Sequence, residues 1–205
     1  MRSIATGIFA AVLLIAAGGP VAAAEPVFAK AGDSLPEVSV RSLDGKELTI
    51  RSVVAKKPSV LIFYRGGWCP FCNRHLSAVA EIQDDLQAAG YQLIAISPDQ
   101  PALLKKTIAK GKLGYTLLSD SPMALAKGLG ITFRLPDPKF ETYKKRFGID
   151  LEAYSGANHH LLPHPAVFLV DTKGKIRFAH VNENYRVRLE PEKILAAARN
   201  SLKKD

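Results

Sequence analysis

The two cysteines of the chain, Cys69 and Cys72, lie three positions apart. Pro70 follows the first of them, and proline is favoured at the first position of a helix, so Cys69 is the predicted N-cap. The positive end of a helix lowers the pKa of a thiol placed there. Such a thiolate attacks a disulfide or a peroxide, and Cys72, one turn along, lies close enough to resolve the product as a disulfide. The pattern predicts redox chemistry at Cys69 and Cys72.

Two other uses of a cysteine pair remain open at this point. Half of a zinc site is one, but zinc needs four ligands, and no second cysteine pair exists; His75 or the pair His159-His160 would have to complete the site. The other is that both cysteines are inert structural residues. We expect neither a metal ion nor a separate cofactor.

Two side chains beside the cysteines are candidates for shaping the site. Trp68 is either a flat hydrophobic wall for a partner or a residue of the core. Arg65 either holds a cysteine as thiolate, or binds a peroxide oxygen, or forms a salt bridge at the surface.

The elements around the cysteines alternate between strand and helix. A hairpin is expected first, because Asp44-Gly45 is a typical turn between residues 38–40 and 47–50. The apolar run at residues 59–64 predicts a strand buried on both faces that leads directly to the cysteines. Further strands are expected at 91–97, 116–118, 166–170 and 176–180, the last two as a hairpin, and helices at 69–89, 101–110, 123–128 and 190–202. This order of elements predicts an α/β fold with helices covering a sheet.

A segment of about 30 residues, 132–163, does not fit this plan. It is rich in proline, aromatic and charged residues, and only residues 141–147 suggest a helix within it. A stretch of this length inside a compact domain is usually a functional loop or lid. A surface insertion with no role is the alternative.

The composition indicates one soluble domain. The chain has 205 residues and a formal net charge of +9, from 28 Lys and Arg against 19 Asp and Glu. The positive charge is scattered and does not alternate with aromatic residues, so a solvated basic surface is favoured over nucleic-acid binding. Two cysteines this close together exclude a disulfide-stabilised scaffold. Neither a Ser-His-Asp order nor a phosphate-binding loop is present, which argues against a hydrolase or a nucleotide-binding protein.

The first 24 residues resemble a signal peptide. A basic start is followed by an apolar run from Ile4 to Ala17, by Gly18-Gly19-Pro20 and by the small residues Ala22-Ala23-Ala24. An uncleaved membrane anchor is the alternative. We therefore expect a signal peptide at 1–24, one domain at 25–205 and export to the periplasm or the extracellular space. A cysteine pair exported to an oxidising compartment forms a disulfide unless it is reduced or cycles, which again favours redox work.

Several segments together resemble a known family. These are Leu35-Pro36, the Asp44-Gly45 turn, the strand at 60–64 that leads to the cysteines, and residues 165–177. They resemble the alkyl hydroperoxide reductase and thiol-specific antioxidant (AhpC/TSA) superfamily over residues 31–200. The resemblance implies a thioredoxin-like fold, with a central mixed sheet flanked by helices and an N-terminal hairpin extension. Residues 65–72, 146–153 and 162–165 are similar to the peroxiredoxin-like branch, so the 132–163 insertion belongs to that branch.

The sequence also departs from the usual peroxiredoxin pattern. The resemblance aligns the peroxidatic cysteine with Cys72, puts Cys69 where a threonine is usual, and puts Pro165 where an arginine is usual. Pro165 instead matches the cis-proline that thioredoxin-like oxidoreductases place beside their two cysteines, and the cost of a cis His164-Pro165 bond is modest. His164 is then a candidate for proton transfer.

Three functions are consistent with these features. The first is an antioxidant that reduces peroxides, cycles Cys69 and Cys72 between dithiol and disulfide, and receives electrons from an external thiol reductant such as a thioredoxin-like protein. The second is a thiol-disulfide oxidoreductase that acts on exported proteins. The third is a redox-sensing or binding module that docks through the insertion. The N-cap position favours Cys69 as the attacking residue, whereas the family alignment favours Cys72. The sequence leaves the oligomeric state open.

Overall fold

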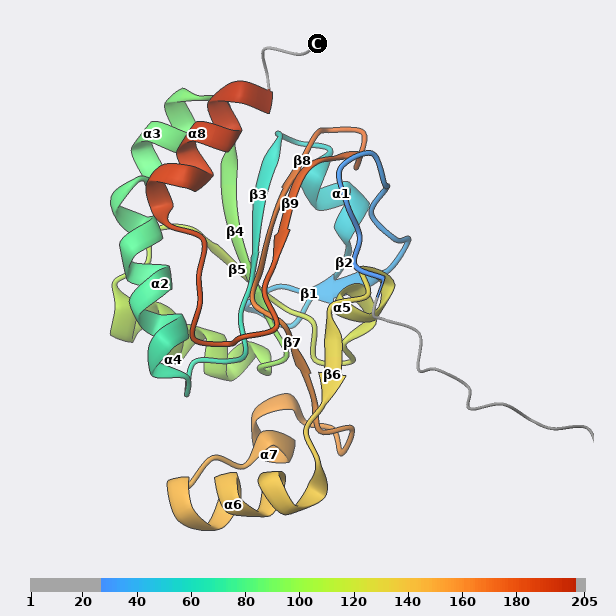
Figure 1. The fold of residues 1–205 in the computed structure, drawn as a ribbon, viewed down its shortest axis with the longest axis vertical. Helices are drawn as coiled ribbons and strands as arrows, with labels where there is room; N and C mark the ends of the chain where they lie inside the picture. The colour runs from blue at the N-terminus through green and yellow to red at the C-terminus, as the bar shows by residue number, and fades with distance from the viewer. Residues whose placement is uncertain (1–26, 202–205) are drawn as a thin grey trace, which may run out of the picture.

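The computed structural model describes residues 27–201 as a mixed seven-stranded sheet between two layers of helices (Figure 1). The strand order is β2-β1-β5-β4-β3-β8-β9. Strands β3, β4 and β5 run parallel to one another, and β8 pairs antiparallel with β3 and with β9. The strands are β1 (Ser39–Arg41), β2 (Glu47–Thr49), β3 (Ser59–Phe63), β4 (Gln92–Ser97), β5 (Thr116–Ser119), β8 (Ala166–Val170) and β9 (Ile176–Val181). The expected mixed sheet and N-terminal hairpin are confirmed.

Alternate residues of β3 face opposite layers of the core, because successive side chains of a strand point to opposite faces. Val60 and Ile62 pack with the helices α2 (Pro70–Glu81), α4 (Pro101–Gly111) and α8 (Pro191–Ser201). Leu61 and Phe63 pack with α1 (Ile50–Val54) and α5 (Ala124–Gly128) on the other face. All five residues of β3 are buried, as the apolar run predicts.

The predicted helix 69–89 is wrong in one respect, because it divides into α2 and α3 (Gln83–Ala88). The break lies at Ile82, whose backbone N–H bonds to the carbonyl of Val79 three residues back. That bond tightens the turn and ends the regular helical ladder. Both helices remain on the same face of the sheet (Figure 1).

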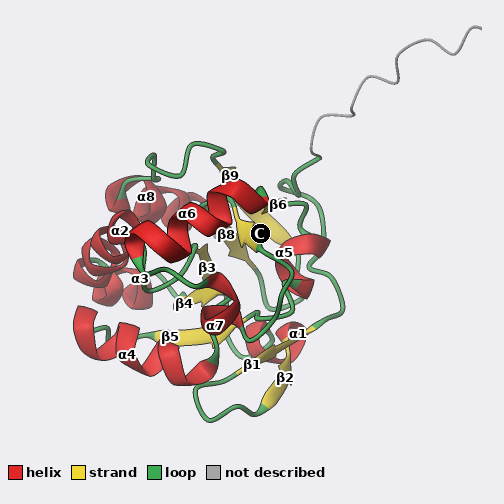
Figure 2. Ribbon diagram, turned by 90° about the horizontal axis from the view of Figure 1, so that it is seen from below, coloured by secondary structure: helices red, strands yellow, loops and turns green. Residues whose placement is uncertain are grey.

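The segment 132–163 is a folded substructure, so the expectation of a loop with at most one helix is wrong. It contains β6 (Thr132–Arg134), α6 (Asp137–Phe147), α7 (Leu151–Ser155) and β7 (Leu161–Pro163), with β6 and β7 paired antiparallel. A small apolar cluster of its own holds it together, formed by Leu135, Phe140, Leu151 and Leu162. Burial of these four side chains explains why the segment is ordered. Seen from below in Figure 2, α6 and α7 lie in front of the ends of the sheet strands.

The sequence predicts a signal peptide, with a membrane anchor as the alternative. The signal peptide at residues 1–24 lies outside the described residues. Within residues 27–201, none of the helices has the length and apolar character needed to cross a membrane.

Candidate active site

The end of β3 delivers the two cysteines to one end of the sheet. Beyond the strand, the N–H of Tyr64 still bonds to Ile96 of β4 at 3.0 Å, so the chain reaches the carboxyl ends of the parallel strands before it turns. Gly66 makes that turn with φ +142°. A Cβ atom there would lie 2.8 Å from Oδ1 of Asp99 and 2.4 Å from Nε1 of Trp68, so only glycine fits.

Cys69 is the N-cap of α2 and Pro70 is its first residue, as predicted. The carbonyl of Cys69 accepts the N–H groups of Cys72 and Asn73, which starts the helix. Both cysteines are reduced, and each is only 1% exposed. Within residues 27–201, no three His, Cys, Asp or Glu side chains gather closely enough to hold a metal ion, so the zinc alternative gains no support.

The two thiols have pKa values shifted in opposite directions. The pKa of Cys69 is lowered to about 6, chiefly because the Cys72 thiol donates a hydrogen bond to it, with help from the Cys72 backbone N–H and the charges of Arg65 and Arg188. The pKa of Cys72 is raised well above its usual value, first by burial and then by its neighbour Cys69. At neutral pH the pair therefore holds one thiolate, on Cys69, and one thiol, on Cys72.

Arg65 is buried directly beside this thiolate, with 2% exposure. Its Nη2 donates to the hydroxyl of Tyr143 at 3.0 Å. Its guanidinium also lies 4.9 Å from the ring centre of Trp68 and 4.5 Å from that of Tyr185. Arg65 forms no salt bridge within residues 27–201, so the alternative of a surface salt bridge is wrong, and hydrogen bonding, cation–π contacts and the thiolate take its place.

A second guanidinium reaches the cysteines from a distant part of the chain. Nη2 of Arg188 donates to Sγ of Cys72 at 3.3 Å. Nη1 of Arg188 bonds to the carbonyls of Tyr185 and Val187, which keeps the side chain in place. Sequence reasoning missed Arg188, because it lies 116 residues from Cys72 in a segment without a local motif. An arginine therefore serves the site although Pro165 occupies the position where the family usually has one.

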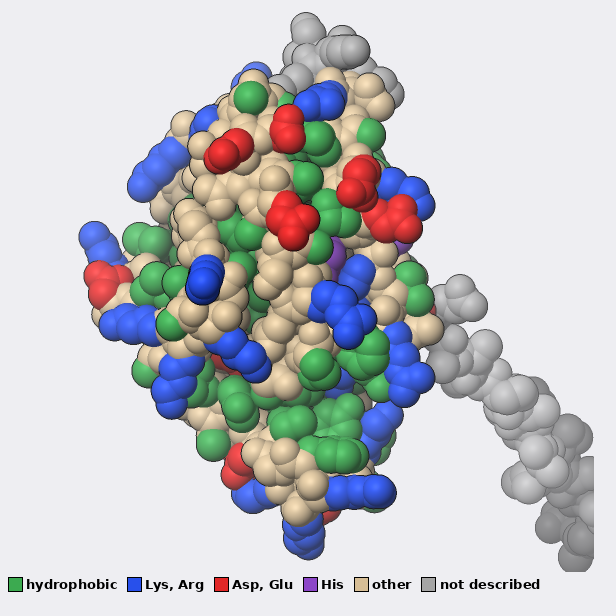
Figure 3. All heavy atoms as spheres, turned by 90° about the vertical axis from the view of Figure 1, so that its left-hand side faces the viewer, with side chains coloured by type: hydrophobic (Ala, Val, Ile, Leu, Met, Phe, Trp, Pro, Cys, Tyr) green, Lys and Arg blue, Asp and Glu red, His purple; other side chains and the backbone are tan. Residues whose placement is uncertain are grey.

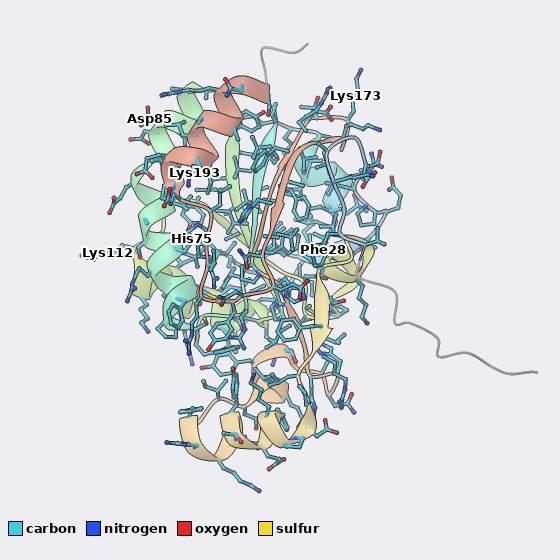
Figure 4. The ribbon with its side chains drawn as sticks, viewed as in Figure 1. Phe28, His75, Asp85, Lys112, Lys173 and Lys193 are labelled. Carbon is cyan, nitrogen blue, oxygen red and sulfur yellow. The ribbon has the colours of Figure 1, made fainter. Side chains whose placement is uncertain are left out.

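His75 anchors the segment that carries Arg188. Its Nε2 bonds to the carbonyl of Leu189 at 2.9 Å. Burial lowers the pKa of His75 to about 4, so the ring is neutral at pH 7 and Nε2 carries the proton of this bond. Figure 4 labels His75 on α2, beside the segment that leads to α8.

Trp68 and the insertion together cover the cysteine loop. The Trp68 ring meets Tyr143 at 5.9 Å and Tyr154 at 6.5 Å, both edge to face. The backbone of Tyr154 also accepts the N–H of Gln100 at 2.8 Å. Trp68 is half-buried and packs on the small core of the insertion, while its role as a wall for a partner stays a prediction.

His164 and Pro165 have their own neighbours in the structure. The His164 ring packs against Phe28 and Phe133, at 5.7 Å and 4.7 Å, and burial lowers its pKa. Pro165 lines a narrow crevice with His75 and Arg188. No cis peptide bond occurs within residues 27–201, so the expected cis-proline is wrong. The backbone N–H of His164 donates to the carbonyl of Ile131 at 2.7 Å, which holds this part of the chain against the residue just before β6.

Asp99 is a buried carboxyl group beneath the cysteine loop, which the sequence did not single out. Its Oδ2 accepts the N–H of Gly67 at 2.7 Å, while Oδ1 has no hydrogen-bond partner within the described residues. Burial raises the pKa of Asp99 to about 7, against the lowering effect of the bonds from Gly67 and Ser97. It lies two residues after β4, at the carboxyl end of the parallel strands, where ligand sites are found in open α/β sheets.

The comparison with known families agrees with this site. The model of the AhpC/TSA family matches residues 31–179, which include β3, both cysteines and most of β9. The chain belongs to the AhpC/TSA family. The expectation of a peroxiredoxin-like thiol oxidoreductase is thereby confirmed.

Individual relatives are more distant. The chain is 27% identical over 157 residues to peroxiredoxin Bcp of Escherichia coli (strain K12), covering 77% of this chain and 87% of that protein. It is 27% identical over 169 residues to the chloroplastic peroxiredoxin Q of Populus jackii, covering 82% of this chain and 66% of that protein.

Solved structures share the fold. Reduced Prx3 of Vibrio vulnificus in complex with hydrogen peroxide has a TM-score of 0.67 at 19% identity, covering 82% of this chain and 97% of that one. Peroxidoxin BcpB of Mycobacterium tuberculosis has a TM-score of 0.64 at 18% identity, covering 85% and 97%. The expected thioredoxin-like fold is confirmed.

The buried carboxyl group of Asp99 predicts an unusual pH dependence of stability. Its folded pKa of about 7 exceeds the usual 3.8, so the group begins to destabilise the fold as pH rises above about 4, and the effect is complete near pH 7. Asp99→Asn keeps an acceptor for Gly67 but carries no charge. We expect this variant to gain up to ~4 kcal/mol in free energy of unfolding, relative to wild type, between pH 4 and pH 8.

The measurement is urea unfolding across this pH range. Asp171→Asn is a control of opposite sign, because burial of Asp171 is outweighed by hydrogen bonds from Lys175 and Arg177 that lower its pKa. A constant difference between Asp99→Asn and wild type at every pH would contradict the prediction.

The contact of Arg188 predicts its effect on Cys69. Replacing Arg188 with alanine removes a nearby positive charge that helps to lower the pKa of Cys69, so we expect that pKa to rise. Arg188→Lys keeps the charge and should retain most of the lowering. The thiolate absorbance at 240 nm, followed against pH in the reduced protein, measures the shift, and equal pKa values in wild type and Arg188→Ala would refute this role.

Proposed function

We propose that this chain is a peroxidase that reduces hydroperoxides by cycling Cys69 and Cys72 between dithiol and disulfide. The observation that carries the proposal is the geometry of the pair: Cys69 is the N-cap of α2, Cys72 lies one turn along, and the guanidinium groups of Arg65 and Arg188 lie beside them, which favours a thiolate on Cys69. Peroxide reduction needs a thiolate to attack and a second thiol to resolve, and both are present at neutral pH. Membership of the AhpC/TSA family supports the same conclusion.

The reaction has two steps. The Cys69 thiolate attacks the terminal peroxide oxygen, which forms the S–O bond of a sulfenic acid and breaks the O–O bond, and the alkoxide or hydroxide leaves with a proton from solvent. The Cys72 sulfur then attacks the sulfenic sulfur and releases water, which leaves a Cys69–Cys72 disulfide. Two electrons have passed from the thiols to the peroxide.

The two arginines act at different steps of this cycle. Arg65 lies beside Cys69 and stabilises its thiolate before the attack. Arg188 already donates to Sγ of Cys72, so it can stabilise that sulfur when it loses its proton during resolution. In this chain the guanidinium groups take the place of the threonine and arginine usual in the family.

Two electrons must return from a thiol reductant outside the site, and we propose a thioredoxin-like protein for this step. A thiol exchanges with the disulfide through a mixed disulfide intermediate. Because each cysteine is 1% exposed, the cover over the sulfurs has to open in each cycle.

Thiol-disulfide exchange with exported proteins is the second candidate. The observation that favours it is the low pKa of an N-cap cysteine paired with a buried thiol, which can release a mixed disulfide. The peptide bond before Pro165 is trans, which removes one argument for this second function, because the expected likeness to thioredoxin sites depended on a cis-proline.

Rapid mixing of the reduced protein with hydrogen peroxide, with an organic hydroperoxide and with a disulfide-containing protein separates the two functions. We expect peroxide oxidation well above the rate of a free thiol. Its rate should rise with pH through about 6 and then level off, because Cys69 ionises there. Trp68 fluorescence reports the reaction. If peroxides oxidise the protein at rates near those of a free thiol, while the protein disulfide exchanges rapidly, the peroxidase function is ruled out.

Two variants of the same experiment assign the attacking residue. Cys72→Ser should still react with peroxide and hold a sulfenic acid that dimedone traps, while Cys69→Ser should lose the fast reaction. An adduct that survives only in Cys69→Ser would assign the attack to Cys72.

We also propose that the protein works outside the cytoplasm, because residues 1–24 have the order of a signal peptide. Expression of the full chain in a Gram-negative host should yield a periplasmic protein that begins near Glu25. Cell fractionation followed by N-terminal sequencing tests this. Removal of residues 1–24 should keep the protein in the cytoplasm, and an intact N-terminus in the membrane fraction would indicate the anchor instead.

A further inference from the structure

Two groups of aromatic side chains lie on either side of Arg65, close to the cysteines. Phe71 of α2 meets Tyr185 at 5.8 Å, Trp68 meets Tyr143 at 5.9 Å, and Tyr143 meets Phe147 at 6.0 Å. We call these five residues the aromatic ridge. They come from three separate segments: the start of α2, α6 of the insertion, and the stretch before α8.

Arg65 joins the two halves of the ridge and connects it to the chemistry. Its guanidinium lies within 6 Å of the ring centres of Trp68, Tyr143 and Tyr185, at 4.9, 5.8 and 4.5 Å. The same charge lowers the pKa of Cys69. Arg65 therefore connects the ridge to the reactive sulfur, and a protein that approaches the cysteines meets the ridge.

The ridge exposes apolar surface at its edges. Phe147 is 57% exposed, and Val187, two residues after Tyr185, is 43% exposed. Only one other large hydrophobic side chain of the described residues, Val27, is comparably exposed. Exposed aromatic surface beside a reactive group is typical of a contact site for another protein.

The rim of the ridge is positively charged. Arg74, Arg146 and Arg186 are all exposed, and the last two lie over the rings of Phe147 and Tyr185, at 5.7 and 5.5 Å. None of these three arginines pairs with a carboxylate among residues 27–201. On the face shown in Figure 3, Lys and Arg side chains surround the hydrophobic side chains of the lower half, while acidic side chains gather mostly in the upper half, over α3 and α8.

We propose that the aromatic ridge is the docking surface for an acidic dithiol protein that reduces the Cys69–Cys72 disulfide. The inference rests on the proposed function, and it adds where the reductant binds and what charge it carries. Carboxylates of the partner pair with Arg74, Arg146 and Arg186, and its apolar surface packs on Phe147. Docking moves the rings off Arg65 and opens the path to the sulfurs.

The electrons balance in two exchanges. A thiolate of the partner attacks Sγ of Cys69 and forms a mixed disulfide, and the Cys72 thiolate leaves beside Arg188 and takes up a proton. The second thiol of the partner then attacks its own half of the mixed disulfide and releases Cys69 as thiolate. The partner ends as a disulfide and this protein as a dithiol, with two electrons transferred.

The test uses the oxidised full domain, with a reduced thioredoxin of net negative charge as the probe. The triple variant Arg74→Glu, Arg146→Glu and Arg186→Glu should lower the second-order rate of reduction by thioredoxin by about tenfold or more. The wild-type rate should fall as salt rises, and the variant should lose that dependence. Phe147→Ala should lower the same rate by several-fold.

Two controls separate docking from general damage. Reduction by dithiothreitol and oxidation by hydrogen peroxide should stay unchanged in the variants, because neither small molecule uses the rim. The matched control reverses three distant exposed lysines, Lys30, Lys173 and Lys175, and should change the thioredoxin rate by less than about twofold. Figure 4 labels Lys173, far from α6.

Three outcomes would overturn the proposal. An unchanged thioredoxin rate in the triple variant is one, and an equal loss with dithiothreitol is another. The third is binding of wild type, but not of the triple variant, to phosphatidylglycerol vesicles while the thioredoxin rates stay equal, which would assign the ridge to a membrane. Because the disulfide can be prepared with diamide, slow peroxide oxidation would refute the peroxidase and still leave the docking measurement intact.

Discussion

The positive charge of Arg65 has to be accommodated without water and without a carboxylate partner among residues 27–201. Removing a guanidinium from water costs several kcal/mol unless other interactions replace its hydration. Here the Tyr143 hydroxyl, three aromatic rings and the Cys69 thiolate replace it. Two of these partners come from segments far along the chain, so the ionisation of the reactive thiol and the packing of α6 depend on the same buried charge.

This dependence gives the insertion a role that its length alone does not indicate. A segment between two strands folds on its own small core and returns Tyr143 and Tyr154 to the cysteine loop. Both sulfurs are shielded from solvent, which strengthens the effect of both guanidinium groups on them. The shield also has to yield when a substrate or a reductant arrives. Protection and access are consequently controlled by the same few aromatic contacts.

The two cysteines differ because of where they lie on one helix. Cys69 is the N-cap and accepts hydrogen bonds, while Cys72 lies one turn along and its thiol donates a hydrogen bond to Cys69. Burial raises the pKa of Cys72, and Arg188 donates a hydrogen bond to its sulfur. The neutral His75 holds the segment of Arg188 in place through a single backbone bond.

Much of the architecture followed from local patterns. The apolar run of β3, the turn at Asp44-Gly45 and the proline after Cys69 act between neighbours in sequence, so the strand, the hairpin and the N-cap were all predictable. The division of the long helix at Ile82 was not predictable, because no helix-breaking residue marks it. The helical hydrogen-bond ladder ends where the N–H of Ile82 bonds to a carbonyl three residues back. The insertion was taken for a loop because its few apolar residues become a core only when α6, α7 and the two strands meet.

The sequence by itself determined the position of the cysteine pair at the start of a helix and the family to which the domain belongs. Only the tertiary structure decided which charged groups act on that pair. Arg188 meets Cys72 across 116 positions, Arg65 meets Tyr143 across 78, and Asp99 meets Gly67 across 32. A pattern of spacings encodes contacts within one strand or one helical turn, whereas these contacts exist only because the sheet order brings the end of β3 together with the insertion and the segment before α8.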